Sequence, residues 1–241
     1  METIVNLLNR MPVEVVAGGL FAFCCLSILF LLTMYGEPGL YLYIGVAVVA
    51  ANIKVLKVVK FPLFPEPIAL GTVLFSSTYL ATDILCEYYG PQSARRGVML
   101  GFCAAVLMTV FMMFTLGFNP NGGFGEMHGH LLAIFSPSLA LLFSGMISYL
   151  CSQYYDVWCY QAIRKLTQGK FLWLRNNGAM LMSSLIDSTI FSTLAWIVFA
   201  KDPLPWKTVA LSYILGTYLL RITVTILQTP IIYWAKYYVK K

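Results

Sequence analysis

The sequence has 241 residues, of which 59% are hydrophobic and only 11% are charged, and its formal net charge is +6. Soluble domains carry about 25% charged residues, so this composition, with a mean hydropathy of +0.77, excludes an ordinary soluble domain. Apolar segments recur along the whole chain with no polar block between them. We therefore expect residues 1–241 to form a single integral membrane domain, an all-α, polytopic bundle of transmembrane helices.

The basic residues lie in short connections between the apolar segments and form no single patch. This distribution is typical of the cytoplasmic loops of membrane proteins. The positive charge therefore indicates a lipid bilayer, and not a nucleic acid, as the partner. The oligomeric state stays open at this stage, with a homodimer as one option.

No catalytic or metal-binding pattern is found in the sequence. The six cysteines form no CxxC pair, so we expect free thiols and neither disulfides nor a metal site. His128 and His130 lie near Glu126, but a further metal ligand is missing. GxSxG, HExxH and Walker-type phosphate loops are all absent from the sequence, so we expect no enzyme, no cofactor and no direct use of ATP.

In chain order, six segments are long and apolar enough to cross a bilayer, which takes about 20 residues. They are residues 15–36, 38–59, 97–118, 131–155, 177–200 and 208–235. Connections rich in Lys and Arg are expected in the cytoplasm. This rule places residues 164–175 and both termini inside, and residues 119–130, which contain no Lys or Arg, outside.

The segment at 67–90 is ambiguous, because it is apolar but is flanked by basic residues on both sides. They are Lys54, Lys57 and Lys60 before it, and Arg95 and Arg96 after it. With both flanks inside, the fold has six transmembrane helices plus one broken or re-entrant segment, which must be shielded by protein or by a wet cavity. The alternative is seven transmembrane helices, which violates the charge bias once.

Asp83 and Glu87 lie in this ambiguous segment, four residues apart and therefore on one face of a helix. An acidic group at the bilayer centre costs about 2.5–3.5 kcal/mol on insertion scales, so two on one face are not expected to point at lipid. Glu87 can be a solvated charge at the end of the helix. Asp83 follows the uncharged stretch 67–82 and needs another explanation.

Asp187 and Arg221 are single charges inside two of the predicted spans. Each needs a partner or a wet cavity. They can pair with each other and hold two helices together, or they can line a polar solute site, and both can be true. Asn52 and Gln228 can likewise bridge helices or contact a solute. Asp156, near the expected end of its segment and close to Arg164, is expected to be an interfacial charge.

The stretch ATDILCEYYGPQSARR, residues 81–96, resembles the signature of the queuosine precursor transporter family, also described as vitamin-uptake-like membrane proteins. Two further stretches also resemble this family: ANIKVLK at 51–57, and LWLRNN followed by SSLIDSTIF between 172 and 191. The resemblance covers about residues 45–235 and keeps the order of the blocks. The matching residues are Thr82, Asp83, Glu87, Tyr89, Gly90, Ala94, Arg95, Arg96, Asn52, Lys57, Trp173, Arg175, Asn176 and Asp187. Arg221 stands where members have a basic residue less uniformly.

The resemblance implies import of 7-deazaguanines (preQ0, preQ1 or queuine) across the bacterial inner (plasma) membrane, for queuosine modification of tRNA. A carboxylate can accept two adjacent N–H groups of a guanine-like edge, so Asp83 and Asp187 are the expected recognition residues. Glu87 would assist or gate, Asn52 would fix the base, and Arg221 would neutralise a carboxylate. Apolar faces would come from Phe75, Tyr79 and Trp196. A standalone secondary transporter or facilitator is expected; the alternative is a substrate-binding membrane subunit that works with a separate ATPase.

Overall fold

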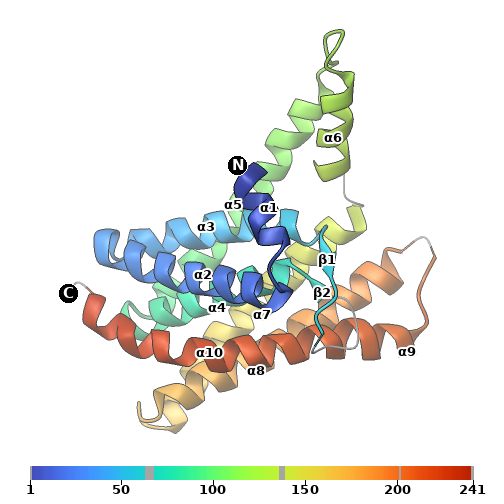
Figure 1. The fold of residues 1–241 in the computed structure, drawn as a ribbon. Helices are drawn as coiled ribbons and strands as arrows, with labels where there is room; N and C mark the ends of the chain where they lie inside the picture. The colour runs from blue at the N-terminus through green and yellow to red at the C-terminus, as the bar shows by residue number, and fades with distance from the viewer. Residues whose placement is uncertain (1, 63–67, 136–138, 201, 240–241) are drawn as a thin grey trace.

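The computed structural model describes residues 2–62, 68–135, 139–200 and 202–239. Its long helices pack around a shared interior, which confirms the predicted all-α helical bundle (Figure 1). In chain order the elements are α1 (Glu2–Asn9), α2 (Val13–Tyr35), α3 (Glu37–Lys54), β1 (Val58–Val59), β2 (Ile68–Ala69), α4 (Gly71–Tyr88), α5 (Pro91–Gly117), α6 (Gly125–Phe135), α7 (Leu139–Leu166), α8 (Leu172–Thr193), η1 (Leu194–Val198), α9 (Trp206–Thr208), η2 (Val209–Leu215) and α10 (Gly216–Tyr238). The elements η1 and η2 are π-helical.

A tight turn joins α2 to α3 and depends on two glycines. Gly36 has a φ of +65°, which suits glycine, and its N–H caps α2 by donating to the carbonyl of Leu32. At Gly39 an added Cβ would lie 2.2 Å from the carbonyl oxygen of Leu31. A side chain there would push the two helices apart, so glycine is what allows α3 to fold back directly along α2.

The helix α4 is the centre of the bundle. Fifteen of its residues are buried, from Gly71 to Cys86, and it contacts α2, α3, α5, α7, α8 and α10. Its start is fixed against α3, because an added Cβ at Gly71 would meet the carbonyl oxygen of Ala51 at 2.8 Å. A helix surrounded by protein can carry Ser, Thr and Asp, which explains why its sequence is less apolar than a lipid-facing span.

The segment predicted to be broken or re-entrant contains this helix. From Gly71 to Tyr88 the helix is uninterrupted, so the prediction of a break is wrong for those residues. A helix of 18 residues is about 27 Å long at 1.5 Å per residue, which approaches the thickness of the hydrocarbon core. The antiparallel pair β1–β2 precedes it, and residues 63–67 lie outside the described residues.

Four of the described helices are long and apolar enough to cross a membrane, and they agree with four of the six predicted spans. They are Val13–Tyr35, Pro91–Gly117, Leu172–Val198 and Trp206–Tyr238. The predicted span 38–59 ends earlier, because α3 stops at Lys54 and a strand follows. The predicted span 131–155 is wrong as one element: α6 ends at Phe135 and α7 begins at Leu139.

The long helices alternate in direction along the chain. The connections α2–α3, α4–α5 and α7–α8 and the C-terminal end of α10 lie at one end of the bundle, to the left in Figure 1. The β1–β2 pair and the α8–α9 connection lie at the opposite end. This alternation favours the seven-crossing alternative, in which Lys54, Lys57 and Lys60 lie at the opposite end from the basic α7–α8 connection.

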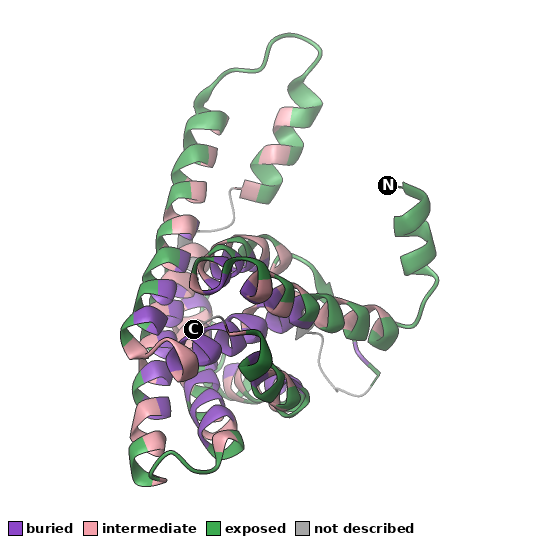
Figure 2. Ribbon diagram, turned by 90° about the vertical axis from the view of Figure 1, so that its left-hand side faces the viewer, coloured by how far each residue is buried: buried purple, intermediate pink, exposed green. Residues whose placement is uncertain are grey.

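The outer faces of the helices are apolar, as expected for contact with lipid. Figure 2 shows buried residues gathered where the long helices pack together, while α1 and the hairpin of α5 and α6 are mostly exposed. A monomeric soluble protein rarely exposes so much contiguous apolar surface. Large exposed side chains include Phe23, Phe30, Val46, Phe111, Phe114, Trp158 and Trp234.

The two topologies differ in where Lys60 lies, and cysteine labelling can tell them apart. We expect Lys60→Cys to react with a membrane-impermeant maleimide on intact cells, because seven crossings place the β1–β2 region outside. Asn121→Cys, outside in both topologies, and Lys170→Cys, inside in both, are the reference variants; all three native residues are exposed. Labelling of Lys60→Cys only after permeabilisation, as for Lys170→Cys, would contradict seven crossings.

Candidate functional site

Polar side chains follow one face of α4 at intervals of four residues and meet a matching row on α7. The hydroxyl of Tyr79 donates to Ser152 Oγ at 2.8 Å, and the hydroxyl of Tyr160 donates to Glu87 Oε2 at 2.9 Å. Each pair is 73 residues apart. Asp83 and Asp156 have the same offset, and both are buried between these two contacts on the facing sides of α4 and α7. A constant offset requires α4 and α7 to run parallel, so their polar residues form three levels.

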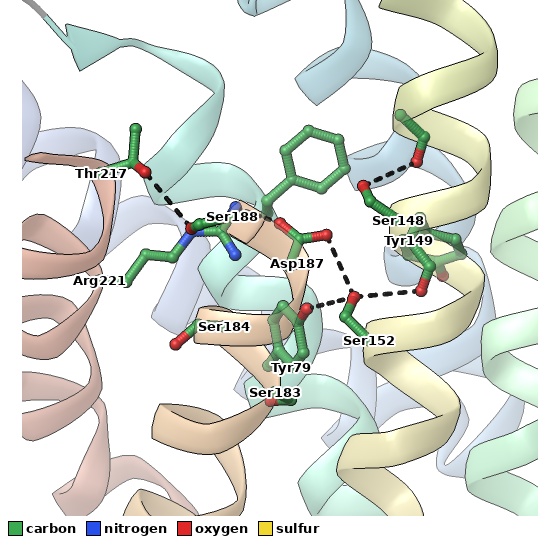
Figure 3. A network of polar contacts seen from close by, with 12 residues as sticks. Tyr79, Ser148, Tyr149, Ser152, Ser183, Ser184, Asp187, Ser188, Thr217 and Arg221 are labelled. Carbon is green, nitrogen blue, oxygen red and sulfur yellow. Dashed lines mark hydrogen bonds and ion pairs between the residues drawn. The ribbon is translucent and has the colours of Figure 1, made fainter. Parts of the chain in front are cut away.

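The first level joins four helices around Tyr79, as Figure 3 shows. Ser152, which accepts from Tyr79, donates to Asp187 Oδ1 at 3.1 Å. The other oxygen, Oδ2, lies 2.5 Å from Nη2 of Arg221, and 13% of the Asp187 side chain and 9% of the Arg221 side chain are exposed. The structure therefore confirms the Asp187–Arg221 pair, which was one of the two explanations predicted for these isolated charges.

Arg221 of the first level and Trp196, which follows Asp187 in the chain, keep unused hydrogen-bond donors. Within the described residues, Nε and Nη1 of Arg221 and the indole N–H of Trp196 have no acceptor. Trp196 lies in the π-helical turn η1 and packs on Tyr213, with ring centroids 5.0 Å apart. Isolated π-helical turns often occur at functional sites. These donors could serve a carbonyl or ring nitrogen of a bound molecule.

The middle level consists of Asp83, Asp156 and Ser183. Asp83 is 1% exposed and Asp156 is fully buried, so the prediction of an interfacial charge at Asp156 is wrong. The prediction failed because α7 continues to Leu166, which places Asp156 well inside the helix. Ser183 Oγ donates to Asp156 Oδ1 at 2.7 Å. Within the described residues, the other three carboxylate oxygens of this level have no hydrogen-bond donor.

The last level is a bidentate ion pair. Nε and Nη2 of Arg175 donate to the two oxygens of Glu87 at 3.0 and 2.6 Å. Only 4% of the Arg175 side chain and 13% of the Glu87 side chain are exposed. Nη1 of Arg175 also donates to the carbonyls of Gly169 and Lys170. Glu87 is therefore not a solvated end charge; it ties α4 to the α7–α8 connection and closes this end of the polar interior.

Two predicted site residues lie in a neighbouring pocket. Asn52 and Phe75 border a small pocket of about 10 Å³ between α3, α4, α5 and α7. Tyr149, three residues before Ser152 on α7, lines it as well. Phe75 precedes Tyr79 by one helical turn. The pocket therefore adjoins the first level, on the side away from the Glu87–Arg175 pair.

The structure thus brings most of the predicted residues to one polar column, and it adds several that the sequence reading missed. Asp156, Ser152, Tyr160 and Ser183 were not predicted. A signal was present on α7, where polar residues recur every fourth position and must share a face: Ser144, Ser148, Ser152, Asp156 and Tyr160.

Comparisons with known proteins agree with the resemblance stated from the sequence. A family model described as "Putative vitamin uptake transporter" matches residues 69–235. The chain belongs to this family. The matched range begins just before α4 and ends within α10, so it includes all three polar levels. Together with the apolar helices, family membership shows that the protein is an integral membrane transport protein.

Two curated relatives carry the same name, "Probable queuosine precursor transporter". The protein of Bacillus subtilis (strain 168) is 35% identical over 205 residues, which cover 84% of this chain and 85% of that protein. The protein of Haemophilus influenzae (strain ATCC 51907 / DSM 11121 / KW20 / Rd) is 24% identical over 133 residues, which cover 55% of this chain and 53% of that protein. No solved structure gives a significant match.

The Glu87–Arg175 pair predicts a large effect on stability. Arg175→Met should destabilise the protein by about 3–5 kcal/mol, because it leaves a buried carboxylate without its counter-charge. Thermal unfolding of the purified protein in detergent would measure the loss. Lys170→Met, in the same connection but exposed, is the control and should change little. Adding Glu87→Gln to Arg175→Met should restore part of the stability; equal unfolding of Arg175→Met and Lys170→Met would contradict the assignment.

Proposed function

We propose that this protein imports 7-deazaguanine precursors of queuosine (preQ0, preQ1 or queuine) across the bacterial inner membrane, as a transporter that works alone. The observation that carries the proposal is the buried polar column between α4, α7, α8 and α10, which keeps unused donors and acceptors inside an apolar bundle. Buried polar groups without partners cost free energy, so a polar ligand that pairs with them is the simplest reason for keeping them. The printed names of the two relatives supply the class of solute.

The chemistry of the column fits a guanine-like base. Such a base presents adjacent N–H donors, which a carboxylate accepts in a bidentate way, and Asp83 has both oxygens available. The base also presents a carbonyl, for which the unused Nε and Nη1 of Arg221 are donors. Asp187 would exchange part of its hydrogen bonding with Arg221 and Ser152 for contacts to the solute. Phe75, Tyr79 and Trp196 would supply the apolar faces.

The described conformation is closed. Asp83 is 1% exposed and Asp156 is fully buried, so a solute reaches the middle level only after helices move. The bidentate Glu87–Arg175 pair blocks the end that faces the α7–α8 connection. The small Asn52–Phe75 pocket lies at the other end of the column, and we propose that the entry route opens there when the helices move, with Asn52 as the first polar contact.

The proposal is tested by uptake of labelled preQ0, preQ1 and queuine into liposomes that contain only this purified chain. We expect uptake of at least one of them, inhibited by the unlabelled compound. Tight binding of the solute without uptake would instead indicate a substrate-binding subunit that needs a separate ATPase. Neither binding nor uptake from a monodisperse sample would refute the assigned class of solute.

Asp83 and Asp187 should be needed for recognition. A hydrogen bond to a charged group contributes about 1.5–3 kcal/mol, so Asp83→Asn and Asp187→Asn should each weaken solute binding about 10- to 100-fold. Binding can be measured by scintillation proximity on detergent-purified protein. Asp202→Asn makes the same chemical change on an exposed connection and should bind like the native chain. Normal uptake by both Asp83→Asn and Asp187→Asn, when they are correctly inserted, would contradict the recognition roles assigned to these two residues.

A further inference from the structure

The two outer levels of the column are neutralised by arginine, whereas the middle level is not. Arg221 pairs with Asp187 and Arg175 pairs with Glu87. No arginine or lysine of the described ranges forms an ion pair with Asp83 or Asp156. Two carboxyl groups within reach of each other, buried and without a cation, cannot both be ionised at acceptable cost, since the charges repel in a low dielectric. Something other than a side-chain cation must neutralise the pair.

A second feature shows that the middle level has capacity to bind. Among the described residues, both oxygens of Asp83 and Oδ2 of Asp156 lack donors. Within the same residues, Oε1 of Gln228 likewise lacks a donor, and its Nε2 lacks an acceptor. Gln228 is fully buried on α10, which packs on α4. Along α10 it lies between Arg221, which pairs with Asp187, and Ile232, whose carbonyl accepts from Tyr88. Gln228 on α10 therefore lies alongside the part of α4 that carries Asp83.

We propose that Asp83 and Asp156 form a proton-binding site, and that the proton bound there travels with the solute. The inference rests on the proposed function. The two carboxyl groups share one proton, so the pair carries a single negative charge, and Ser183 donates to Oδ1 of Asp156. Because each carboxylate oxygen has two lone pairs, Asp83 can share this proton with Asp156 and still accept an N–H group of a base.

The charge of the middle level determines which loaded states of the bundle can close. Without the proton, the middle level holds two negative charges, and closing the bundle around them is unfavourable. With the proton and a solute that donates to Asp83, the oxygens that lack partners acquire them. The loaded and protonated state can therefore close and reopen at the other side more easily than the solute-loaded but deprotonated one. That difference couples the flow of protons to the flow of solute.

Other ionisable groups surround the pair and set the range of pH over which it works. The groups that interact with Asp83 or Asp156 come from α4 and from α7, and the charged residues of α8 and α10 lie at the two neighbouring levels. They are Tyr79, Cys86 and Glu87 on α4, Cys159 and Tyr160 on α7, Arg175 and Asp187 on α8, and Arg221 on α10. The cations among them are already paired, so they do not replace the proton.

The test uses the neutral nitrile preQ0, because the amine of preQ1 could itself neutralise the pair. Liposomes containing the native chain receive an inside-alkaline gradient of about one pH unit, with the electrical potential clamped to zero by potassium and valinomycin. One proton per solute allows accumulation of about tenfold, which a protonophore should abolish. Asp156→Asn keeps a donor toward Asp83 but cannot release a proton, so it should equilibrate preQ0 without accumulating it.

Each outcome decides. Accumulation in the native chain and simple equilibration in Asp156→Asn support the inference. Equilibration without accumulation in the native chain overturns it and leaves the proposed function standing, as does accumulation driven by a sodium gradient. Accumulation by Asp156→Asn overturns the role of Asp156, and uptake of preQ1 but not preQ0 shows that a cationic amine, and not a proton, neutralises the pair. No uptake of any of the three bases refutes the proposed function itself.

A second measurement covers the case in which Asp156→Asn does not fold. Weakly buffered liposomes of the native chain, without an imposed gradient, are given external preQ0 while a pH dye reports the outer medium. Inward movement of protons with the solute should make that medium more alkaline, with about one proton per solute. A medium whose pH stays constant during measured uptake contradicts the inference. Asp202→Asn serves as the matched control in both assays.

Discussion

Everything in the interior of this protein follows from one constraint: a charge buried between helices and away from water must meet an opposite charge, a hydrogen-bond donor or a proton. Two levels of the column satisfy it with arginine, through Asp187–Arg221 and Glu87–Arg175. The middle level, Asp83 with Asp156, does not. The bundle therefore carries two carboxyl groups without a counter-charge at its centre, between two levels whose carboxylates are paired with arginine. That arrangement concentrates any ligand-dependent change in free energy at one place, between the two ion pairs.

The column also constrains the topology. Contacts at a constant offset of 73 residues require α4 and α7 to run in the same direction over at least two helical turns. An irregular segment that enters and returns on the same side cannot keep such a register. The helix α5 lies between them in the chain and runs back in the opposite direction (Figure 1), so α4 behaves as a full member of the alternating bundle. The pairing of polar side chains and the path of the backbone thus support the same arrangement, although one rests on chemistry and the other on geometry.

Much of the site could be predicted from the sequence, because an isolated charge in an apolar span has few explanations. A pair between Asp187 and Arg221 was one of the two explanations of these charges, and Asp83 and Glu87 were not expected to point at lipid. Asp156 was misplaced for a physical reason: hydropathy marks where a chain becomes polar, which is not where a helix ends. The helix α7 continues ten residues beyond Asp156, and the aromatic residues around it pack inside as well as at the surface. For the same reason the apolar run at 131–155 hid the boundary between α6 and α7. The partner of Glu87 could not be predicted either, because Arg175 lies 88 residues away along the chain, next to a connection with the composition of an ordinary basic loop.

The closed last level gives the column a direction. Opening it separates Glu87 from Arg175, and Arg175 from the two carbonyls of the α7–α8 connection, which leaves two charges in need of water or of new partners. A bound solute can drive this change only if it binds the open state more favourably than the closed one, since equal affinity for both shifts nothing. Asp83 of the middle level lies four residues before Glu87 on the same face of α4. A change of charge at Asp83 therefore acts directly on the carboxylate of Glu87. Binding of one proton by the Asp83–Asp156 pair would reduce the electrostatic repulsion on Glu87, and release of that proton would restore it. The Glu87–Arg175 pair and the proposed proton site are thus electrostatically linked along one helix, with no need for a moving domain to connect them.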